Sequence, residues 1–192
     1  KAMNKGHSSL TSGGLEHMNI ERTATVLDIG CGGGKTVDRL CSIVANGKVY
    51  GIDYSELSVK SSEKLNSKNI LCNKAKILQA SVSDMPFDNN TFDNITAVET
   101  YYFWPDKEND VKEVFRVLKQ GGTVMLLFEM LRTDDDPFKW EKVENMLNIK
   151  SVTPQEIRAV LESAGFENIN TYTKEGTTWL CATAQKPKGD EN

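Results

Sequence analysis

One stretch, residues 26–36, constrains the fold of this chain more than any other part of its sequence. It opens with the mainly apolar run of residues 26–29, as expected for a buried parallel strand. Glycines then occupy every second position: Gly30, Gly32 and Gly34. A glycine backbone accepts positive φ and lets a ligand approach without Cβ atoms in the way. The residues that follow predict a helix over 35–45, whose N-terminal amides point at whatever lies over the turn.

The spacing of these glycines separates three kinds of binding turn. A phosphate-binding P-loop, G-x-x-x-x-G-K-S/T, needs a glycine where this chain has Ile29. A dinucleotide-binding turn, G-x-G-x-x-G/A, places its third glycine at Lys35, which is too bulky for close helix packing. The remaining pattern, D-x-G-x-G-x-G starting at Asp28, resembles the first motif of the class I S-adenosylmethionine-dependent methyltransferases, in particular the small-molecule, type 11-like enzymes. A plain tight turn in an α/β domain is the alternative.

The order of the elements predicts an α/β fold. Strands and helices alternate along the chain, which favours a doubly wound sheet that is mostly parallel. The resemblance extends from Thr25 to Gln185 and implies the Rossmann-like methyltransferase fold, with seven strands and the last strand antiparallel. We expect residues 1–192 to form a single methyltransferase domain, with 1–22 as an N-terminal helical arm and 130–150 as an insert in the substrate wall.

Local signals predict where several elements begin. Ser55 is the expected N-cap of one helix, and Thr153, followed by a proline and a glutamate, predicts a capped start for another. Pro105 is expected to open a third helix. Residues 69–73 read as a connector, and a glycine pair is expected to turn the chain into a fifth strand at Thr123.

The second strand ends in an acid, Asp53, a little over 20 residues after the first glycine. An acid at this place accepts hydrogen bonds from the ribose hydroxyls of a bound nucleotide. Both S-adenosylmethionine and NAD carry such a ribose, so Asp53 indicates an adenosyl ligand but does not distinguish between the two. The resemblance also implies cofactor contacts for the turn residue Cys31 and for Tyr54. A catalytic thiol at Cys31 is not expected, because no histidine lies near it in the sequence.

Residues 81–87 resemble the motif with which this family reads the edge of adenine. The family usually has an acid where this chain has Ser81, and the nearest acid is Asp84. A serine hydroxyl can accept one hydrogen bond from the adenine amino group, more weakly than a carboxylate. The backbone amide of Val82 can donate a hydrogen bond to a ring nitrogen of adenine, whatever side chain the residue carries. Ser81 and Val82 are therefore expected cofactor contacts.

An acid and four aromatic residues follow the fourth strand. In open parallel sheets, ligands bind beyond the carboxyl ends of the strands. Glu99 is therefore the candidate general base, and it is also a candidate contact to the amino group of the methyl donor. Tyr101, Tyr102 and His7 are candidate substrate contacts, whereas Trp104 is expected to pack in the core. Phe138 and Trp140 are weaker candidates for the substrate wall.

Composition limits the remaining choices. The 192 residues carry a net charge of −4 and have no basic stripe, which argues against nucleic acid as a partner. No apolar run approaches the roughly 20 residues of a membrane helix. The four cysteines form no C-x-x-C pair, so we expect neither a metal site nor disulfides, and a cytoplasmic location.

The sequence therefore predicts methyl transfer from S-adenosyl-L-methionine to an unidentified small molecule, with S-adenosyl-L-homocysteine as the product. Two alternatives stay open: an NAD-dependent oxidoreductase on a related fold, and a non-catalytic adenosylmethionine-binding domain. The position of Lys35 argues against the first, and the serine at position 81 keeps the second open.

Overall fold

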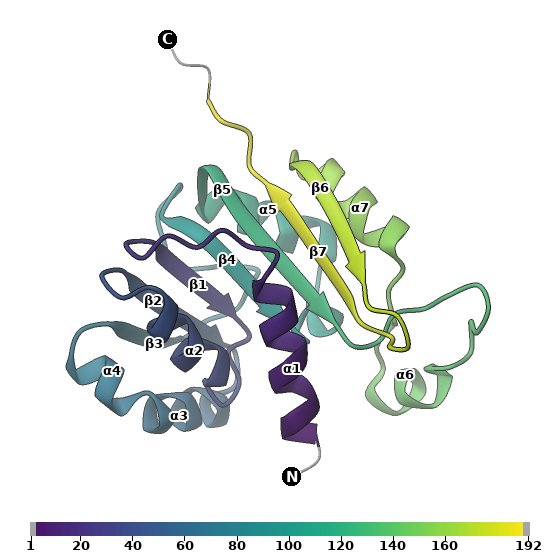
Figure 1. Cartoon of the computed structure of the whole chain (residues 1–192), viewed down its shortest axis with the longest axis horizontal. Coiled ribbons are helices and arrows are strands. Elements are labelled where there is room, and N and C mark those ends of the chain that lie inside the picture. The colour runs from purple at the N-terminus through teal and green to yellow at the C-terminus, as the bar shows by residue number, and fades with distance from the viewer. Residues whose placement is uncertain (1–2, 190–192) are drawn as a thin grey trace.

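A computed structural model describes the backbone of residues 3–189 and the side chains of residues 9–189. Its centre is one seven-stranded sheet (Figure 1). The strands are β1 (Thr25–Ile29), β2 (Lys48–Asp53), β3 (Ala75–Gln79), β4 (Phe92–Val98), β5 (Leu118–Phe128), β6 (Glu167–Thr173) and β7 (Leu180–Gln185). The α-helices are α1 (Met3–Leu15), α2 (Lys35–Ile43), α3 (Glu56–Leu65), α4 (Ser67–Leu71), α5 (Lys107–Val117), α6 (Glu141–Leu147) and α7 (Pro154–Ser163), and a 3-10 turn, η1, spans Tyr101–Phe103.

The sheet has the predicted doubly wound topology. Its strand order is β3-β2-β1-β4-β5-β7-β6, with β1, β2, β3, β4 and β5 all parallel. The chain proceeds outward from β1 to β3 and then returns to place β4 on the other side of β1, so the order reverses between β1 and β4. The last strand, β7, is antiparallel to both β5 and β6. The predicted fold class is thus confirmed, including the antiparallel last strand.

Helices cover both faces of the sheet, and each face has its own core. In Figure 1, α1 and α2 lie in front of the sheet and α5 and α7 lie behind it. Alternate side chains of a strand point to opposite faces. Accordingly, Val26 of β1 packs in the cluster that contains Leu40 of α2, whereas Leu27 packs in the cluster that contains Val114 of α5. β1 is buried on both sides, as its apolar sequence predicted.

The helix α1 contains a pair of glycines, Gly13 and Gly14, in its last turn. Gly14 lies directly on β5, where an added Cβ would stand 2.8 Å from a methyl group of Leu127. The missing side chain therefore lets the helix approach the sheet closely, which offsets the low helix propensity of glycine. Among the helices that the structure describes, none is long and apolar enough to cross a membrane.

Two predicted starts and one predicted connector need correction. The helix α5 begins at Lys107 because Asp106 is its N-cap and accepts a hydrogen bond from the Asn109 amide. Pro105 stands outside the helix. The predicted connector over 69–73 contains part of the short helix α4, and β5 begins at Leu118, before its glycine pair. The predicted caps at Ser55 and Thr153 are confirmed, the second as a complete capping box.

Candidate active site

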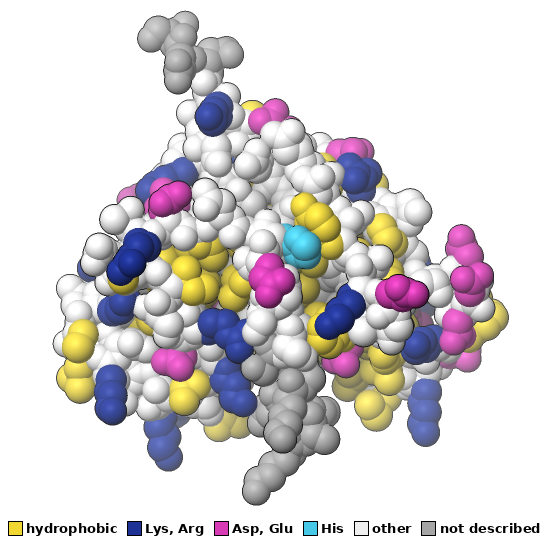
Figure 2. Space-filling model, viewed as in Figure 1, with side chains coloured by type: hydrophobic (Ala, Val, Ile, Leu, Met, Phe, Trp, Pro, Cys, Tyr) yellow, Lys and Arg dark blue, Asp and Glu magenta, His cyan; other side chains and the backbone are white. Residues whose placement is uncertain are grey.

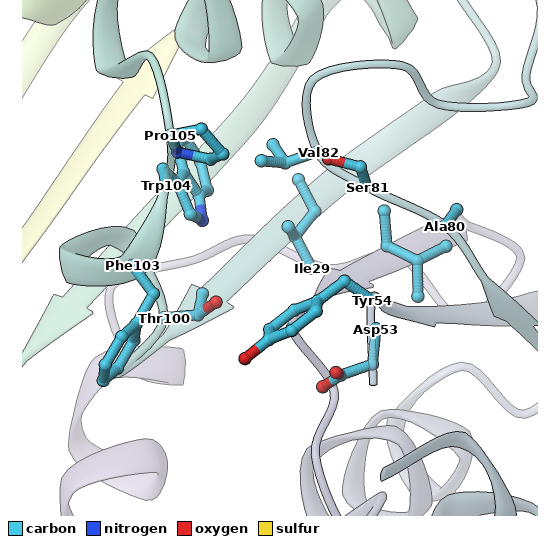
Figure 3. A pocket seen from close by; sticks show the side chains of 12 residues that line it. Ile29, Asp53, Tyr54, Ala80, Ser81, Val82, Thr100, Phe103, Trp104 and Pro105 are labelled. Carbon is cyan, nitrogen blue, oxygen red and sulfur yellow. The ribbon is translucent and has the colours of Figure 1, made fainter. Parts of the chain in front are cut away.

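A cavity of about 240 Å³ opens where the strand order reverses (Figure 3). It lies beyond the carboxyl ends of β1, β2, β3 and β4, which is where open α/β sheets bind ligands. Five residues with a predicted cofactor role line it: Gly30, Asp53, Tyr54, Ser81 and Val82. These residues come from three separate loops, so the fold brings together what the sequence motifs indicated one by one.

The three glycines of the turn all have positive φ, with values of 68° at Gly30, 49° at Gly32 and 81° at Gly34. A Cβ at Gly30 would stand 2.1 Å from the hydroxyl oxygen of Thr100, and one at Gly34 would stand 2.4 Å from that of Ser62. Gly30 and Gly34 are therefore required by packing. A Cβ at Gly32 would meet nothing within 4 Å, so the space above this residue is free for a ligand.

The carboxylate of Asp53 is held in place by two backbone amides. The Gly32 amide donates to Oδ2 at 2.9 Å, and the Ser55 amide donates to Oδ1 at 2.9 Å. The side chain is only 8% exposed, yet it lines the cavity. Each carboxylate oxygen keeps a further lone pair for a ligand. Asp53 thus connects the end of β2 to the glycine turn and presents two acceptors suited to a pair of vicinal hydroxyls.

The loop that contains Ser81 and Val82 is fixed by helix α5. Glu113 accepts a hydrogen bond from the Met85 amide at 2.9 Å, and Arg116 donates to the Phe87 carbonyl at 2.8 Å. The Ser81 hydroxyl oxygen accepts a hydrogen bond from the Ser83 amide at 3.2 Å. One lone pair and the hydroxyl proton of Ser81 remain available for a ligand.

Two aromatic rings stand at the mouth of the cavity. Tyr54 is 76% exposed and Phe103 is 51% exposed, and both line the cavity. Figure 3 shows them on opposite sides of the opening. Aromatic side chains that line the mouth of a cavity supply large, rigid contact surfaces to a ligand. Their position suits contacts to a planar or apolar group.

Asp28 of β1 and Cys31 of the glycine turn are both buried, and neither lines the cavity. The Asp28 carboxylate accepts a hydrogen bond from the Thr96 hydroxyl at 2.7 Å. Burial raises its pKa to about 7. Burial also raises the pKa of the Cys31 thiol to about 12, so this thiol stays protonated and unreactive at neutral pH.

Glu99 follows β4 with a φ of 58°, a backbone conformation that is strained for glutamate. Its carboxylate accepts hydrogen bonds from the Glu129 amide, at the end of β5, and from the Tyr102 hydroxyl. Burial, and secondarily the Glu129 charge, raise the Glu99 pKa to about 8. Glu99 does not line the cavity described above but stands beside it, over the ends of β4 and β5.

The candidate substrate residues differ in their surroundings. Tyr101 and Tyr102 are both 5% exposed, and the Tyr102 hydroxyl accepts a hydrogen bond from the Met130 amide at 2.9 Å. The Trp140 indole donates to the Leu131 carbonyl at 3.0 Å, whereas Phe138 is 73% exposed. His7 falls in α1, but its side chain lies outside the described residues.

Sequence reasoning placed the aromatic run after β4 at the ligand end of the sheet but did not name the residues of this run that line the cavity. The residues Thr100, Phe103, Trp104 and Pro105, which follow β4, line it together with Ile29, Ile52 and Ala80. Trp104 is buried, as expected of a packing residue, and its ring centroid lies 5.1 Å from that of Tyr101. The available signal was the placement of the whole aromatic run at the carboxyl end of a parallel strand. Among the described side chains, no group of three or more His, Cys, Asp or Glu residues could hold a metal ion.

The residues of the cavity fit an adenosyl ligand. The turn offers free space over Gly32, Asp53 offers two acceptors for ribose hydroxyls, and a loop beyond β3 offers polar groups to a base. A doubly wound sheet with these features at its switch point defines the class of enzymes that bind a nucleotide-like cofactor.

Comparisons with known proteins identify the family within this class. The family model described as a methyltransferase domain matches residues 27–126, so the chain belongs to that family of S-adenosylmethionine-dependent enzymes. The chain is 27% identical over 175 residues to the Bacillus subtilis methyltransferase YdaC, covering 90% of this chain and 89% of that protein. It is 30% identical over 186 residues to the ubiquinone/menaquinone biosynthesis C-methyltransferase UbiE of Cronobacter sakazakii, covering 84% and 74% of the two chains.

Solved structures with the same fold include proteins with other chemistry. The cyclase SpnF superposes with a TM-score of 0.82 at 18% identity, over 94% of this chain and 81% of the other. At this level of identity the likeness shows the fold alone. Function must therefore be argued from the site and the family.

Proposed function

We propose that the protein transfers a methyl group from S-adenosylmethionine to a small, largely apolar or planar molecule. The observation that supports this most is the cavity at the switch point, where Gly30, Asp53 and the Ser81–Val82 loop surround one space. Two exposed rings, Tyr54 and Phe103, stand at its mouth and favour an acceptor with an apolar face. The relative UbiE is named for ubiquinone and menaquinone biosynthesis, and an acceptor of this kind is consistent with the proposal.

Each part of the site has a role in this proposal. Asp53 holds the ribose hydroxyls, Ser81 and Val82 read the edge of the base, and the space over Gly32 takes the amino-acid end of the donor. The bound donor supplies an already activated methyl group on a sulfonium centre. The protein therefore needs chiefly to orient the acceptor and exclude water. Tyr101 and Tyr102, which are buried after β4, stay candidate substrate contacts, as does His7 of α1.

Calorimetric titration with S-adenosylmethionine, S-adenosylhomocysteine and NAD, one at a time, tests the cofactor part of this proposal. We expect micromolar binding of the first two and no binding of NAD, because Lys35 stands where a dinucleotide turn needs a small residue. Binding of NAD alone would overturn the proposal. Release of S-adenosylhomocysteine with a panel of quinols, phenols and sterols would then identify the acceptor. Donor binding with no release from any acceptor class would favour a binding domain.

Glu99 is the proposed general base if the acceptor must lose a proton. Because its pKa lies near 8, it is largely protonated at pH 7 and gains its negative charge as the pH rises. We expect kcat/KM to increase with pH, to reach half its maximum near the Glu99 pKa of about 8, and to level off above it. Glu99→Gln should lower the rate by about 100-fold or more and remove this dependence.

The neighbouring acid provides the control. Glu129→Gln removes a charge that helps raise the Glu99 pKa but keeps the backbone amide that binds the Glu99 carboxylate. The dependence on pH should persist in this variant and shift to lower pH. A rate that is independent of pH between 6 and 9 in the unmodified enzyme would exclude Glu99 as the base.

A further inference from the structure

Tyr102 and Glu99 are tied to the same segment, directly after β5. The Glu99 carboxylate accepts a hydrogen bond from the Glu129 amide. The next amide along the chain, that of Met130, donates to the Tyr102 hydroxyl oxygen at 2.9 Å. The Tyr102 hydroxyl in turn donates to the Glu99 carboxylate. Two successive amides therefore hold an acid and a tyrosine that are also bonded to each other.

The Tyr102 hydroxyl is used by the protein both as an acceptor and as a donor. A phenol hydroxyl has one proton to donate, and its oxygen can accept. Because the Met130 amide donates to the oxygen, the proton is directed to Glu99. The side chain is 5% exposed and does not line the cavity. Burial, and secondarily the Glu99 charge, raise the pKa of Tyr102 above its usual range, so the hydroxyl keeps its proton throughout the neutral and mildly alkaline range.

Glu99 differs from the solvated acids of this chain. Figure 2 shows acidic side chains scattered over the surface of the molecule, whereas Glu99 is half-buried over the ends of β4 and β5. Its φ of 58° is a strained conformation that persists only where the surroundings enforce it. The Glu129 amide and the Tyr102 hydroxyl each take one accepting position of the carboxylate, and its other positions remain for a substrate.

The hydrogen bond from Tyr102 is stronger when Glu99 is charged. A hydrogen bond to an ionised group is roughly twice as strong as one between neutral groups. The contact therefore favours the carboxylate and opposes burial and the Glu129 charge, which together raise the Glu99 pKa to about 8. Among the described residues, Glu129 after β5 and Tyr102 in η1 are the ionisable groups that act on Glu99. The tyrosine thus affects the pH at which Glu99 can take up a proton.

We propose that Tyr102 is a positioning residue for Glu99: its hydroxyl fixes the orientation of the carboxylate and stabilises the charged form that accepts a proton. This inference rests on the proposed function, because it assumes that Glu99 removes a proton from the acceptor. In that step the Glu99 carboxylate takes the proton, and the electron pair left on the acceptor forms the bond to the methyl carbon. The bond from this carbon to sulfur breaks, and its electron pair stays on the sulfur. The proton of the Tyr102 hydroxyl stays on its oxygen throughout.

Titration of the Glu99 carboxyl carbon by carbon-13 NMR tests the contact in the protein without ligand. Phenylalanine at position 102 keeps the ring and removes only the hydroxyl. We expect the midpoint of Glu99 in Tyr102→Phe to rise by about one pH unit, because the charged form loses a hydrogen bond. The Glu99 signal is assigned by its absence from the spectrum of Glu99→Gln.

Tyr101→Phe is the matched control for this titration. Tyr101 and Tyr102 are both 5% exposed, and each ring centroid lies 5.6 Å from that of Phe128. The acids that act on Tyr101 lie on α5 and α7. The Glu99 midpoint should therefore stay near 8 in Tyr101→Phe, whatever the effect of that substitution on stability or rate. Equal midpoints in the two variants would overturn the inference.

The pH profile of the rate separates this inference from the proposed function. With the quinol, phenol or sterol that releases S-adenosylhomocysteine, kcat/KM of Tyr102→Phe should be about 10-fold lower at pH 7. The difference should shrink as the pH rises through the new midpoint, whereas a merely structural defect would lower the rate equally at every pH. The Kd for S-adenosylhomocysteine should not change, because Tyr102 does not line the cavity.

The unmodified enzyme decides which proposal fails. If its rate does not depend on pH, the proposed role of Glu99 fails and the inference fails with it. If the dependence is present and Tyr102→Phe has the same midpoint, only the inference fails.

A spectroscopic measurement on the unmodified protein does not depend on the folding of a variant. With carbon-13 at the ring carbon that bears the hydroxyl, the five tyrosines give five signals. The Tyr102 signal should move with a midpoint near 8, because its hydroxyl meets the charge that develops on Glu99. The Tyr101 signal should stay in place over this range, since burial raises the pKa of Tyr101 to about 12. If no tyrosine signal follows the titration of Glu99, the proposed contact is contradicted.

Discussion

Gly32→Val is expected to abolish cofactor binding and leave a folded protein. The space above Gly32 is open, so the protein itself has room for the side chain, but a bound ligand does not. The φ of 49° adds strain for a β-branched residue. This strain would also disturb the hydrogen bond that the backbone amide at position 32 donates to Asp53. We expect Kd for S-adenosylhomocysteine to rise by about 100-fold or more, a loss of about 2.7 kcal/mol. Calorimetry gives the affinity, and thermal unfolding gives the stability.

The hairpin between β6 and β7 offers the matched control. Gly176 has a φ of 71° and open space around its missing side chain, so Gly176→Val introduces a comparable strain far from the cavity. This variant should lose some stability and keep its affinity. Gly32→Asn separates strain from obstruction, since asparagine tolerates positive φ. Normal binding by Gly32→Asn would mean that the ligand does not pass over Gly32.

Asp53→Ala should weaken S-adenosylhomocysteine binding by about 1–3 kcal/mol, the cost of losing hydrogen bonds to a charged group. The structure adds a reason to expect the upper end of that range. Removal of the carboxylate also leaves the Gly32 and Ser55 amides without their acceptor, which loosens the turn itself. The measurement is calorimetric titration together with hydrogen exchange at these two amides, which should become faster.

Glu63→Ala is the charge-matched control for Asp53→Ala. Glu63 is exposed on α3, so its removal changes the net charge equally without touching the cavity. It should bind S-adenosylhomocysteine as the unmodified protein does. If Asp53→Ala and Glu63→Ala bind equally well, the assignment of Asp53 to the ribose is wrong.

The parts of the site that the sequence could predict are those built from local backbone. The turn at Gly30, Gly32 and Gly34 needs positive φ at fixed spacing, and that need is visible in the residues themselves. The position of Asp53 could be predicted in the same way, because it ends a strand at a characteristic distance from the turn. The caps at Ser55 and Thr153 depend on neighbours within a few residues, and both were predicted correctly.

The parts that the sequence could not predict depend on contacts between distant segments. Periodicity did not place β7 between β5 and β6, because pairing partners leave no mark on the pattern within one strand. Trp104 looked like a packing residue, and it is one, but only the folded chain shows that it also lines the cavity. Glu99 was found as an acid, whereas its contact with the Glu129 amide required the alignment of β4 with β5.

The two amides that hold Asp53 bear on the thermodynamics of ligand binding. The carboxylate is already oriented by Gly32 and Ser55 in the chain without ligand, so binding does not have to order it. The loop with Ser81 is likewise fixed in advance by Glu113 and Arg116, which do not line the cavity. Binding to a preorganised site loses little conformational entropy, because few groups have to be ordered when the ligand enters. Replacement of bound S-adenosylhomocysteine by S-adenosylmethionine should therefore require no refolding of the segments that carry Asp53 and Ser81.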